Sequence, residues 1–336
     1  MSVRVGVIGA GNIGVAHIRR LTTKTSGAEV VAVTDLDPDR AAAVAASVGA
    51  RALDTGDEVI TAAEVDAVVV TSWGPSHEEY VLAAIAEGKP VFCEKPLATT
   101  AGACARIMAA EQAHGDRLVQ VGFMRRYDAG YRAMKRVLDS GRIGPALLAH
   151  CAHRNPTTSV ARYSTDMAVT DTAVHEVDVL RWLLDEEFGM VEVRRPRRSS
   201  LAAPDLQDPQ IMLLETESGV HVDLEVYVNC RFGYDIRCEV VAETGTVSLA
   251  DDGPVAVRTA EAVSVAVPAD WQTRFRAAYD TELQEWVDSV VAGKIVGPSS
   301  WDGYAAAITT DALLIAQQGR HRVPVRLTDR PDFYPH

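Results

Sequence analysis

The chain has 336 residues, of which 47% are hydrophobic and 24% are charged, a composition typical of a globular protein with a sizeable core. This length exceeds the roughly 100–200 residues of a single domain, so we expect two domains. The charge balance, 33 basic against 46 acidic residues or −13, would repel phosphate backbones and anionic lipids. We therefore expect neither nucleic acid nor a membrane as a partner, and we interpret the one basic cluster, at residues 194–198, as a strand end or loop.

Five cysteines are present, an odd number without a C-x-x-C pair, and most of them lie within apolar runs where a thiol behaves as a small hydrophobe. This usage favours a reducing compartment. The sequence begins with a strand pattern rather than a signal peptide, and no apolar run approaches the roughly 18 residues that span a bilayer. We expect a cytoplasmic protein.

Up to about residue 122, short apolar runs alternate with amphipathic helical patterns, as in βαβ units. The pattern predicts a Rossmann domain over residues 1–122, an α/β fold with a doubly wound parallel sheet. The expected strands are 3–8, 29–34, 67–72, 90–93 and 118–122, and the expected helices are 13–23, 39–48, 76–87 and 100–113.

Beyond residue 122 the pattern changes to a period of two, which is sustained for ten residues over 220–229. We predict an α+β domain over residues 123–336 with a mostly antiparallel, open sheet. The other expected strands are 146–153, 190–195, 210–216, 236–242 and 255–267, and the expected helices are 171–184, 274–291 and 301–317.

A glycine motif, GAGNIG at residues 9–14, follows the first strand and opens a helix, as a G-x-G-x-x-G fingerprint must do to hold a pyrophosphate on backbone amides. Asp35 ends the second strand, where its carboxylate can accept hydrogen bonds from the adenosine ribose. Because Asp35 would repel a 2′-phosphate, and Asp37 and Asp39 follow it in place of an arginine, we predict NAD rather than NADP.

Two further features carry possible chemistry, although each is common on its own. Lys95 follows the strand at 90–93, and ligands bind beyond the carboxyl ends of parallel strands. Asp171 and His175 lie one helical turn apart in a polar stripe that continues through Asp178 and Trp182. Alone, Lys95 reads as a solvated lysine, and Asp171 as a helix cap. His17, on the first helix, is expected to face solvent.

Taken together, these segments resemble the Gfo/Idh/MocA oxidoreductases, nearly from end to end, and within that family they are most similar to the enzymes that oxidise inositol. The segments that carry the resemblance are GAGNIG with Asp35, SWGPSHE (72–78), CEKPLATT (93–100), VGFMRRYDAGY (121–131), CAHRNP (151–156), DTAVHEVDVLRWLL (171–184), YVNCRFGYDIRCEVVAETG (227–245), DWQTRF (270–275) and GPSSWDGYAAAITTDA (297–312).

The resemblance implies a catalytic group, a cofactor site and a sugar-like pocket, with no metal. The implied catalytic residues are Lys95, Asp171 and His175, with a cis peptide before Pro96. The implied NAD-binding residues are Gly9, Gly11, Asn12, Ile13, Gly14, Asp35, Ser72, Trp73, His77, Glu94 and Lys95. The implied substrate-binding residues are Lys95, Arg125, Tyr127, His153, Asn155, Asp171, His175 and Tyr234.

The chemistry implied is oxidation of a cyclitol secondary alcohol, in the catabolism of myo-inositol, to 2-keto-myo-inositol, with His175 as general base. Asp171 would orient the imidazole, and the Lys95 ammonium would stabilise charge on the reacting oxygen. The resemblance also implies a homotetramer formed through the open sheets. The alternatives are a dehydrogenase for scyllo-inositol, D-chiro-inositol or glucose, and a non-catalytic sensor of dinucleotide and sugar, which would have lost the catalytic group.

Overall fold

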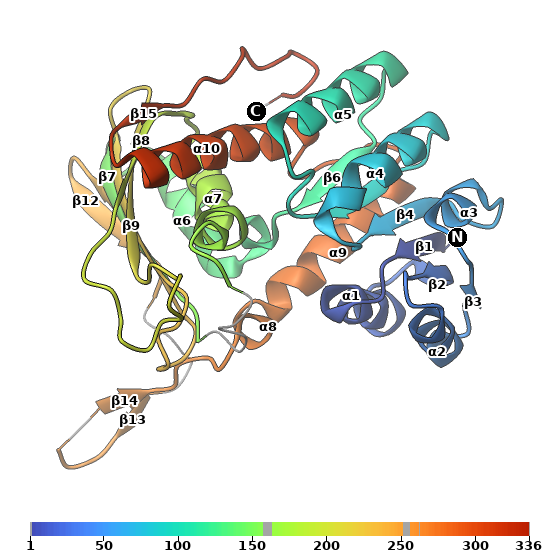
Figure 1. Cartoon of the computed structure of the whole chain (residues 1–336), viewed down its shortest axis with the longest axis horizontal. Helices are drawn as coiled ribbons and strands as arrows, with labels where there is room; N and C mark the ends of the chain where they lie inside the picture. The colour runs from blue at the N-terminus through green and yellow to red at the C-terminus, as the bar shows by residue number, and fades with distance from the viewer. Residues whose placement is uncertain (1, 157–162, 251–255, 262, 336) are drawn as a thin grey trace. The chain divides into compact units, whose positions relative to one another are not determined.

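The computed structural model describes residues 2–156, 163–250, 256–261 and 263–335 (Figure 1). The chain forms two compact units. The first comprises Met1–Met124, Tyr279–Ala307 and Thr328–His336, and the second comprises Arg125–Ala278 and Ile308–Leu327. The division at residue 122 stays a prediction about independently folding domains.

In the first unit, six parallel strands form one sheet in the order β3-β2-β1-β4-β5-β6, which confirms the predicted Rossmann arrangement. All four residues of β4 and of β5 are buried, because helices lie on both faces of the sheet (Figure 1). The strands are β1 (Val3–Ile8), β2 (Ala28–Thr34), β3 (Arg51–Ala52), β4 (Ala67–Val70), β5 (Val91–Glu94) and β6 (Val119–Gly122).

The helical segments of the first unit are α1 (Asn12–Thr23), α2 (Pro38–Val48), α3 (Gly56–Thr61), the 3₁₀ turn η1 (Gly74–Ser76), α4 (His77–Ala86) and α5 (Ala101–His114). Helices α1, α2, α4 and α5 begin and end close to the predicted positions, whereas α3 was not predicted. On one face of the sheet, α1 and α2 share a core with Leu283, Trp286 and Val287 of α9 (Arg276–Val291). A helix from the last fifth of the chain therefore completes the core of the dinucleotide-binding fold.

In the second unit, seven strands form a mixed sheet in the order β12-β11-β7-β10-β9-β8-β15. Every neighbouring pair is antiparallel except β10 with β7, so the prediction of a mostly antiparallel sheet is confirmed. The strands are β7 (Ala146–Arg154), β8 (Phe188–Arg194), β9 (Gln210–Thr216), β10 (His221–Tyr227), β11 (Asp235–Ala242), β12 (Gly245–Ser248) and β15 (Val323–Pro324).

The single strand predicted over residues 255–267 is wrong. Two short strands, β13 (Ala256–Arg258) and β14 (Val263–Val265), pair with each other as a separate sheet, and positions 255 and 262 lie outside the described residues. The apolar alternation predicts one strand because it continues on both sides of the bend at Ala260 and Glu261.

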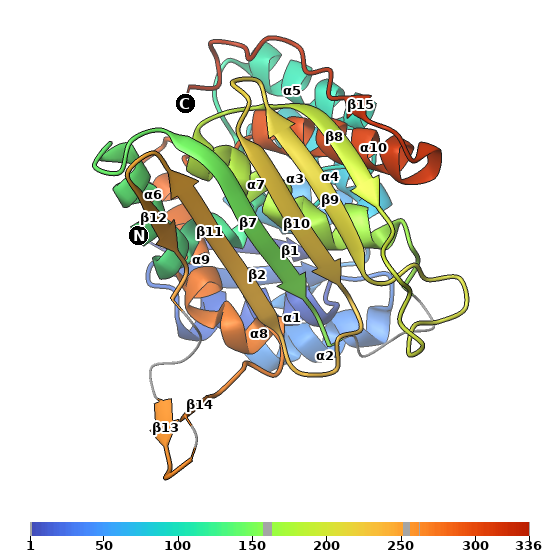
Figure 2. The same cartoon turned by 90° about the vertical axis from the view of Figure 1, so that its left-hand side faces the viewer.

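The helices of the second unit lie against one face of this sheet, and Figure 2 shows the opposite face with no described helix over it. The helical segments are the 3₁₀ turn η2 (Met124–Tyr127), α6 (Ala129–Asp139), the π-helical turn η4 (Ala168–Ala173), α7 (Val174–Leu184), α8 (Trp271–Arg274) and the second half of α10 (Ser300–Gly319).

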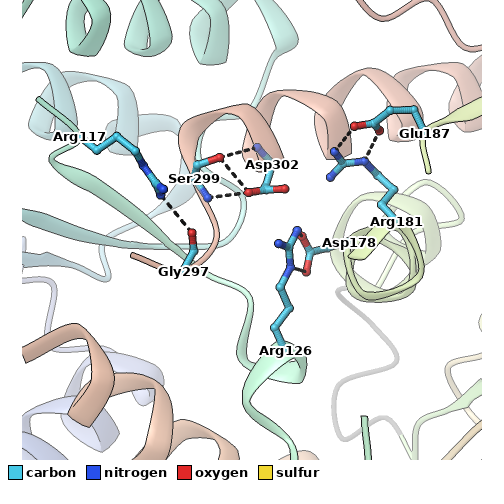
Figure 3. A network of polar contacts seen from close by, with 8 residues as sticks. All are labelled: Arg117, Arg126, Asp178, Arg181, Glu187, Gly297, Ser299 and Asp302. Atoms are coloured by element: carbon cyan, nitrogen blue, oxygen red, sulfur yellow. Dashed lines mark hydrogen bonds and ion pairs between the residues drawn. The ribbon is translucent and has the colours of Figure 1, made fainter. Parts of the chain in front are cut away.

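Along the polar stripe predicted at residues 171–182, Asp171 is exposed, His175 and Trp182 are half-buried, and Asp178 is buried. Helix α7, which carries most of this stripe, is otherwise largely buried. Its charged side chains are buried through pairing: Asp178 receives hydrogen bonds from Arg126, and Arg181 donates to Glu187 (Figure 3). Charged residues on one helix face give the same amphipathic sequence pattern whether they contact water or pair with opposite charges inside the protein. The pattern therefore does not distinguish a solvent-exposed face from a buried, paired one.

Other general expectations can be compared with the described residues. None of the five cysteines, all of which are described, forms a disulfide, and all are buried. Arg195 and Arg198 of the basic cluster donate to backbone carbonyl oxygens, as suits a structural loop. Over the described ranges, no helix is long and apolar enough to cross a membrane.

Candidate active site

The glycine motif turns directly from β1 into α1. Gly9 has φ of +100°, and a Cβ there would lie 2.6 Å from the backbone nitrogen of Ser72. A Cβ at Gly14 would lie 2.0 Å from the carbonyl oxygen of Gly9. Both positions therefore require glycine, the first for its backbone conformation and the second for close packing of α1 against β1.

Gly11 differs, because a Cβ there would meet nothing within 4 Å. It is the N-cap of α1, and its first turn, which contains the exposed Asn12 and half-buried Ile13, receives no side-chain cap in the described structure. The turn therefore offers backbone N–H groups beside open space, which is the arrangement that accepts a pyrophosphate. The residues present fit a dinucleotide.

Asp35 lies immediately after β2, and its side chain is only 9% exposed. Its Oδ2 accepts a hydrogen bond from the Ala10 N–H at 2.6 Å, and its Oδ1 accepts one from the Asp37 N–H at 2.9 Å. The carboxylate is thus fixed beside the glycine loop. Arg40, which the sequence analysis overlooked, lies with Nη1 3.5 Å from Asp35 Oδ1.

Ser72, Trp73 and His77 follow β4 at the same sheet edge as the glycine loop. The Trp73 side chain is 74% exposed, and Ser72 is half-buried with its hydroxyl bonded to that of Ser76 at 2.8 Å. His77 is buried, and both of its ring nitrogens contact carbonyl oxygens of the protein. Trp73 and Ser72 can meet a ligand, whereas His77 is occupied by the protein.

Lys95 follows β5, and the peptide bond between Lys95 and Pro96 is cis, as predicted. Lys95 is half-buried, and its backbone N–H donates to Oε2 of Glu94 at 3.1 Å. Glu94 is buried, so its carboxylate is bound within the protein rather than extended toward solvent. Its predicted contact with the cofactor stays a prediction.

In the second unit, Asp171 lies in the π-helical turn η4, not at the start of an α-helix as predicted. Its side chain is exposed, and its Oδ2 lies 3.3 Å from the hydroxyl of Tyr163. Burial and the negative charge of Asp171 raise the pKa of Tyr163 above its ordinary value, so the phenol stays protonated. Tyr163 lies outside every recognisable motif, and the sequence analysis overlooked it.

His175 is in the first turn of α7 and is half-buried, with its ring centroid 6.4 Å from that of His153 on β7. A half-buried imidazole keeps part of its surface accessible to a ligand. This is the accessibility that a general base needs, because it must approach the proton that it removes.

Behind His175 lies a buried polar network of Arg125, His153, Glu176 and Tyr234. Glu176 receives a hydrogen bond from Arg125 Nη1, and its Oε2 lies 3.0 Å from His153 Nδ1. His153 Nε2 lies 3.2 Å from the Tyr234 hydroxyl. Each of the four residues is at most 2% exposed. Buried charges need such pairing, because an unpaired charge in the interior is strongly destabilising.

The electrostatics of the network fix its protonation. Burial lowers the pKa of His153 although the Glu176 carboxylate opposes the shift, so the ring is neutral near pH 7. Burial alone would raise the pKa of Glu176, but Arg125 and His153 hold it below its ordinary value. Burial raises the pKa of Tyr234 to about 12. His153 Nδ1 thus lies between the Glu176 carboxylate and Arg125 Nη2, which is 3.1 Å away, while Nε2 faces the Tyr234 hydroxyl.

Asn155 and Tyr127, the remaining predicted substrate residues, differ in accessibility. Asn155 is half-buried, and its backbone is fixed to Tyr227 and Cys230, which leaves its position well defined. Tyr127 is 5% exposed, with the Arg132 guanidinium 4.9 Å from its ring centroid. Asn155 is therefore better placed than Tyr127 to meet a ligand.

The structure thus brings Arg125, His153, Tyr234 and His175 together within the second unit. Lys95 belongs to the first unit and Asp171 and His175 to the second, so their joint action stays a prediction. Four residues that the sequence analysis did not place at the site lie beside predicted residues: His17, Arg40, Tyr163 and Glu176. Glu176 was adjacent to His175 in a quoted motif, and a buried partner for Arg125 could have been sought there.

Comparison with known proteins supports both the Rossmann fold of the N-terminal part and the α/β fold of the C-terminal part. Residues 3–123 match the family model described as "Oxidoreductase family, NAD-binding Rossmann fold", and residues 135–327 match "Oxidoreductase family, C-terminal alpha/beta domain". The chain is 60% identical over 334 residues to inositol 2-dehydrogenase 3 of Saccharopolyspora erythraea, covering 99% of this chain and 98% of that protein. It is 56% identical to inositol 2-dehydrogenase of Serratia proteamaculans, covering 99% of both.

A solved structure of myo-inositol dehydrogenase from Lactobacillus casei, in complex with NAD(H) and myo-inositol, matches with a TM-score of 0.97 at 41% identity, covering all of both chains. The apo scyllo-inositol dehydrogenase of the same organism matches with a TM-score of 0.90 at 25% identity, covering 96% of this chain and 98% of that one. With both of its halves matched, the chain belongs to the Gfo/Idh/MocA family of NAD-binding oxidoreductases.

Proposed function

We propose that the protein catalyses the NAD-dependent oxidation of myo-inositol at its single axial hydroxyl, giving 2-keto-myo-inositol. The observation that carries this proposal is the full-length similarity to the Lactobacillus casei enzyme bound to NAD(H) and myo-inositol, at 41% identity against 25% for the scyllo-inositol enzyme of that organism. Between these two enzymes of one organism, the higher identity favours the myo-inositol dehydrogenase as the model for this chain.

His175 is the general base in this proposal. NAD supplies the hydride acceptor. His175 takes the hydroxyl proton as the substrate carbon loses its hydride, and the residue as a whole is only half-buried. Asp171 orients the imidazole and stabilises its charged form, in the way that a carboxylate serves a catalytic histidine. The Lys95 ammonium stabilises negative charge on the reacting oxygen.

Tyr234, His153 and Asn155 form the polar wall of the proposed substrate site. The His153 ring holds the buried Tyr234 hydroxyl, so the polar groups of this wall are fixed in position rather than free to rotate. Arg125 and Tyr127 support this wall, because their polar and aromatic groups already contact Glu176 and Arg132. Fixed polar groups discriminate between stereoisomers, since the wrong isomer leaves them unpaired.

The test is a panel of initial rates of NADH formation with myo-inositol, scyllo-inositol, D-chiro-inositol and glucose. We expect the highest kcat/KM for myo-inositol and 2-keto-myo-inositol as the product. A strong preference for scyllo-inositol or glucose would contradict the substrate assignment while leaving the family intact. Absence of turnover with every sugar, with NAD still bound, would favour a non-catalytic sensor.

We further propose that the protein acts in the cytoplasm, in myo-inositol catabolism, as a homotetramer formed through the open face of the second unit's sheet. This face carries cross-strand pairs, such as Arg154 with Glu225 and Asp235, rather than a covering helix from the described residues. Light scattering after size exclusion tests the assembly. A reversal of charge at Glu225 should weaken it, and a monomeric wild-type protein would contradict it.

A further inference from the structure

A histidine in the middle of α1 is fully buried, contrary to the expectation that it faces solvent. His17 is 0% exposed and lies between the rings of Phe92 and Tyr279, each with its centroid 5.6 Å away. Its Nε2 lies 2.7 Å from Oε1 of Glu94. Its Nδ1 has no hydrogen-bond partner among the described residues. The tautomer that satisfies this environment carries its proton on Nε2 and donates it to the Glu94 carboxylate.

Glu94 transmits this contact to the backbone of Lys95. While Oε1 accepts from His17, Oε2 accepts the backbone N–H of Lys95 at 3.1 Å. Glu94 is only 6% exposed, so its carboxylate depends on these protein donors in place of water. Without the imidazole, Oε1 would be left without its donor, and the carboxylate would gain from turning away from the Lys95 amide toward water.

A second buried histidine holds the other side of the same turn. His77 is 2% exposed, with Nδ1 2.7 Å from the carbonyl oxygen of Pro96 and Nε2 3.0 Å from that of Ser72. Glu94 and Pro96 flank Lys95 in the sequence. The backbone on both sides of the lysine is therefore held by a histidine from a different helix, α1 on one side and α4 on the other.

We propose that His17 and His77 are positioning residues for Lys95: they fix the backbone from which the lysine side chain extends, and His17 links that backbone to the helix of the dinucleotide loop. The inference rests on the proposed role of Lys95 in hydride transfer. Neither histidine touches substrate in this proposal. Each acts through the lysine turn, and a displacement of about 1 Å at a catalytic group can lower a rate by about 10²-fold.

The test compares His17→Leu, which removes the donor, with His17→Gln, whose amide N–H can reach Glu94. Leu21→Ala is the control, because Leu21 is also fully buried on α1 and its truncation destabilises the core without touching the lysine turn. We expect His17→Leu to lower kcat by about 10- to 100-fold, with a larger deuterium isotope effect on kcat and an unchanged Kd for NAD. His17→Gln should recover most of the loss, and Leu21→Ala should lower only the thermal stability.

A double-variant cycle with Lys95→Ala asks whether His17 acts through the lysine. If it does, His17→Leu will cost little further activity once Lys95 is absent. The proposal would be overturned if His17→Leu lowered kcat by the same factor in the presence and absence of Lys95. A wild-type kcat for His17→Leu would also overturn it. Should His17→Leu fail to fold, His77→Leu takes its place in the same cycle.

Amide hydrogen exchange at Lys95 supplies a readout that needs no substrate. We expect faster exchange at Lys95 in His17→Leu than in Leu21→Ala, and unchanged exchange would overturn the proposal. If the Lys95 amide exchanges faster in His17→Leu than in Leu21→Ala, but the wild-type protein fails to oxidise inositol, the proposed function is wrong. The positioning of the Lys95 backbone by His17 then still stands.

Discussion

Replacing Asp35 by serine should narrow the preference for NAD over NADP. The Asp35 side chain is 9% exposed and its orientation is fixed by the N–H groups of Ala10 and Asp37, so it cannot move away from a 2′-phosphate. At an effective dielectric constant of about 20, two unit charges about 4 Å apart interact by about 4 kcal/mol. Solvent and Arg40, 3.5 Å away, offset part of this repulsion. We expect a net penalty of about 2–3 kcal/mol, or a change of about 30- to 150-fold in relative kcat/KM.

Arg40 makes the prediction sharper. Its guanidinium lies beside Asp35 and also donates to Asp37 Oδ2 at 3.1 Å. Once Asp35 is replaced, this guanidinium loses one of its two anionic partners and can pair with a 2′-phosphate. In the Asp35→Ser background, Arg40→Gln should therefore lower kcat/KM for NADP by about 10-fold and leave the value for NAD nearly unchanged.

The assay is the initial rate of reduction of each cofactor at saturating inositol, for the wild-type protein, Asp35→Ser and the double variant. The single variant Arg40→Gln is the matched control, because with Asp35 present it should affect NADP little. Equal kcat/KM for the two cofactors in the wild-type protein would refute the role of Asp35. An NADP activity in Asp35→Ser that is indifferent to Arg40 would refute the role of the arginine.

Three further predictions concern single substitutions. His175→Ala should lower kcat by about 10²–10⁴ with little change in the Kd for NAD, and single-turnover hydride transfer at the wild-type rate would show that the base lies elsewhere. Burial raises the pKa of Asp208 to about 6 from 3.8, so the folded state keeps a proton that the unfolded state releases, and stability from this group is lost as pH rises from about 4 through 6. The urea midpoint of Asp208→Asn relative to wild type should therefore rise between pH 5 and pH 8, and a constant difference would contradict this. Tyr334→Phe removes a 2.8 Å hydrogen bond to the buried carboxylate of Glu111 and should lower the free energy of unfolding by about 1.5–3 kcal/mol without affecting kcat, as checked by urea denaturation and rate assays.

Much of the fold could be predicted because its signals are local. β1 and β9 begin and end at the predicted residues, since buried parallel strands are continuous apolar runs and half-exposed strands alternate. The helix α6 was missed although its signals are also local: Asp128 caps its N-terminus through the amides of Gly130 and Tyr131. By contrast, β3 has only two residues and α3 only six, too few for a periodic signal.

The packing of α9 shows a different limit. Its periodic apolar residues predict a helix, and the helix is present, but the sequence does not say which sheet its Leu283 and Trp286 cover. The answer depends on the surface formed by α1 and α2, which end at Thr23 and Val48, far earlier in the chain than α9. Such long-range packing is decided by the whole core rather than by the segment itself.

One part of the candidate site could likewise be predicted from local sequence signals, and another part could not. The cofactor half could be predicted from spacing because backbone geometry imposes it: Gly9 needs a positive φ, and Gly14 needs the absence of a Cβ. The π-helical turn that carries Asp171 left no periodic signal, because it is a single irregular turn directly before α7. The catalytic assignment of Asp171 therefore came from the motif as a whole and not from helical spacing.

The buried polar pairs could not be predicted from any single segment of the sequence. Arg125 and Glu176 are 51 residues apart, and His17 and Glu94 are 77 residues apart, yet each pair is nearly or fully excluded from water. A charged or polar side chain in a sequence is most often solvated, so His17 was read as exposed. Its burial is tolerated because its Nε2–H donates a hydrogen bond to the Glu94 carboxylate. The same carboxylate accepts a hydrogen bond from the backbone N–H of Lys95. Buried polar groups that are paired in this way hold nearby backbone in a defined position. Here His17, through Glu94, holds the turn at Lys95.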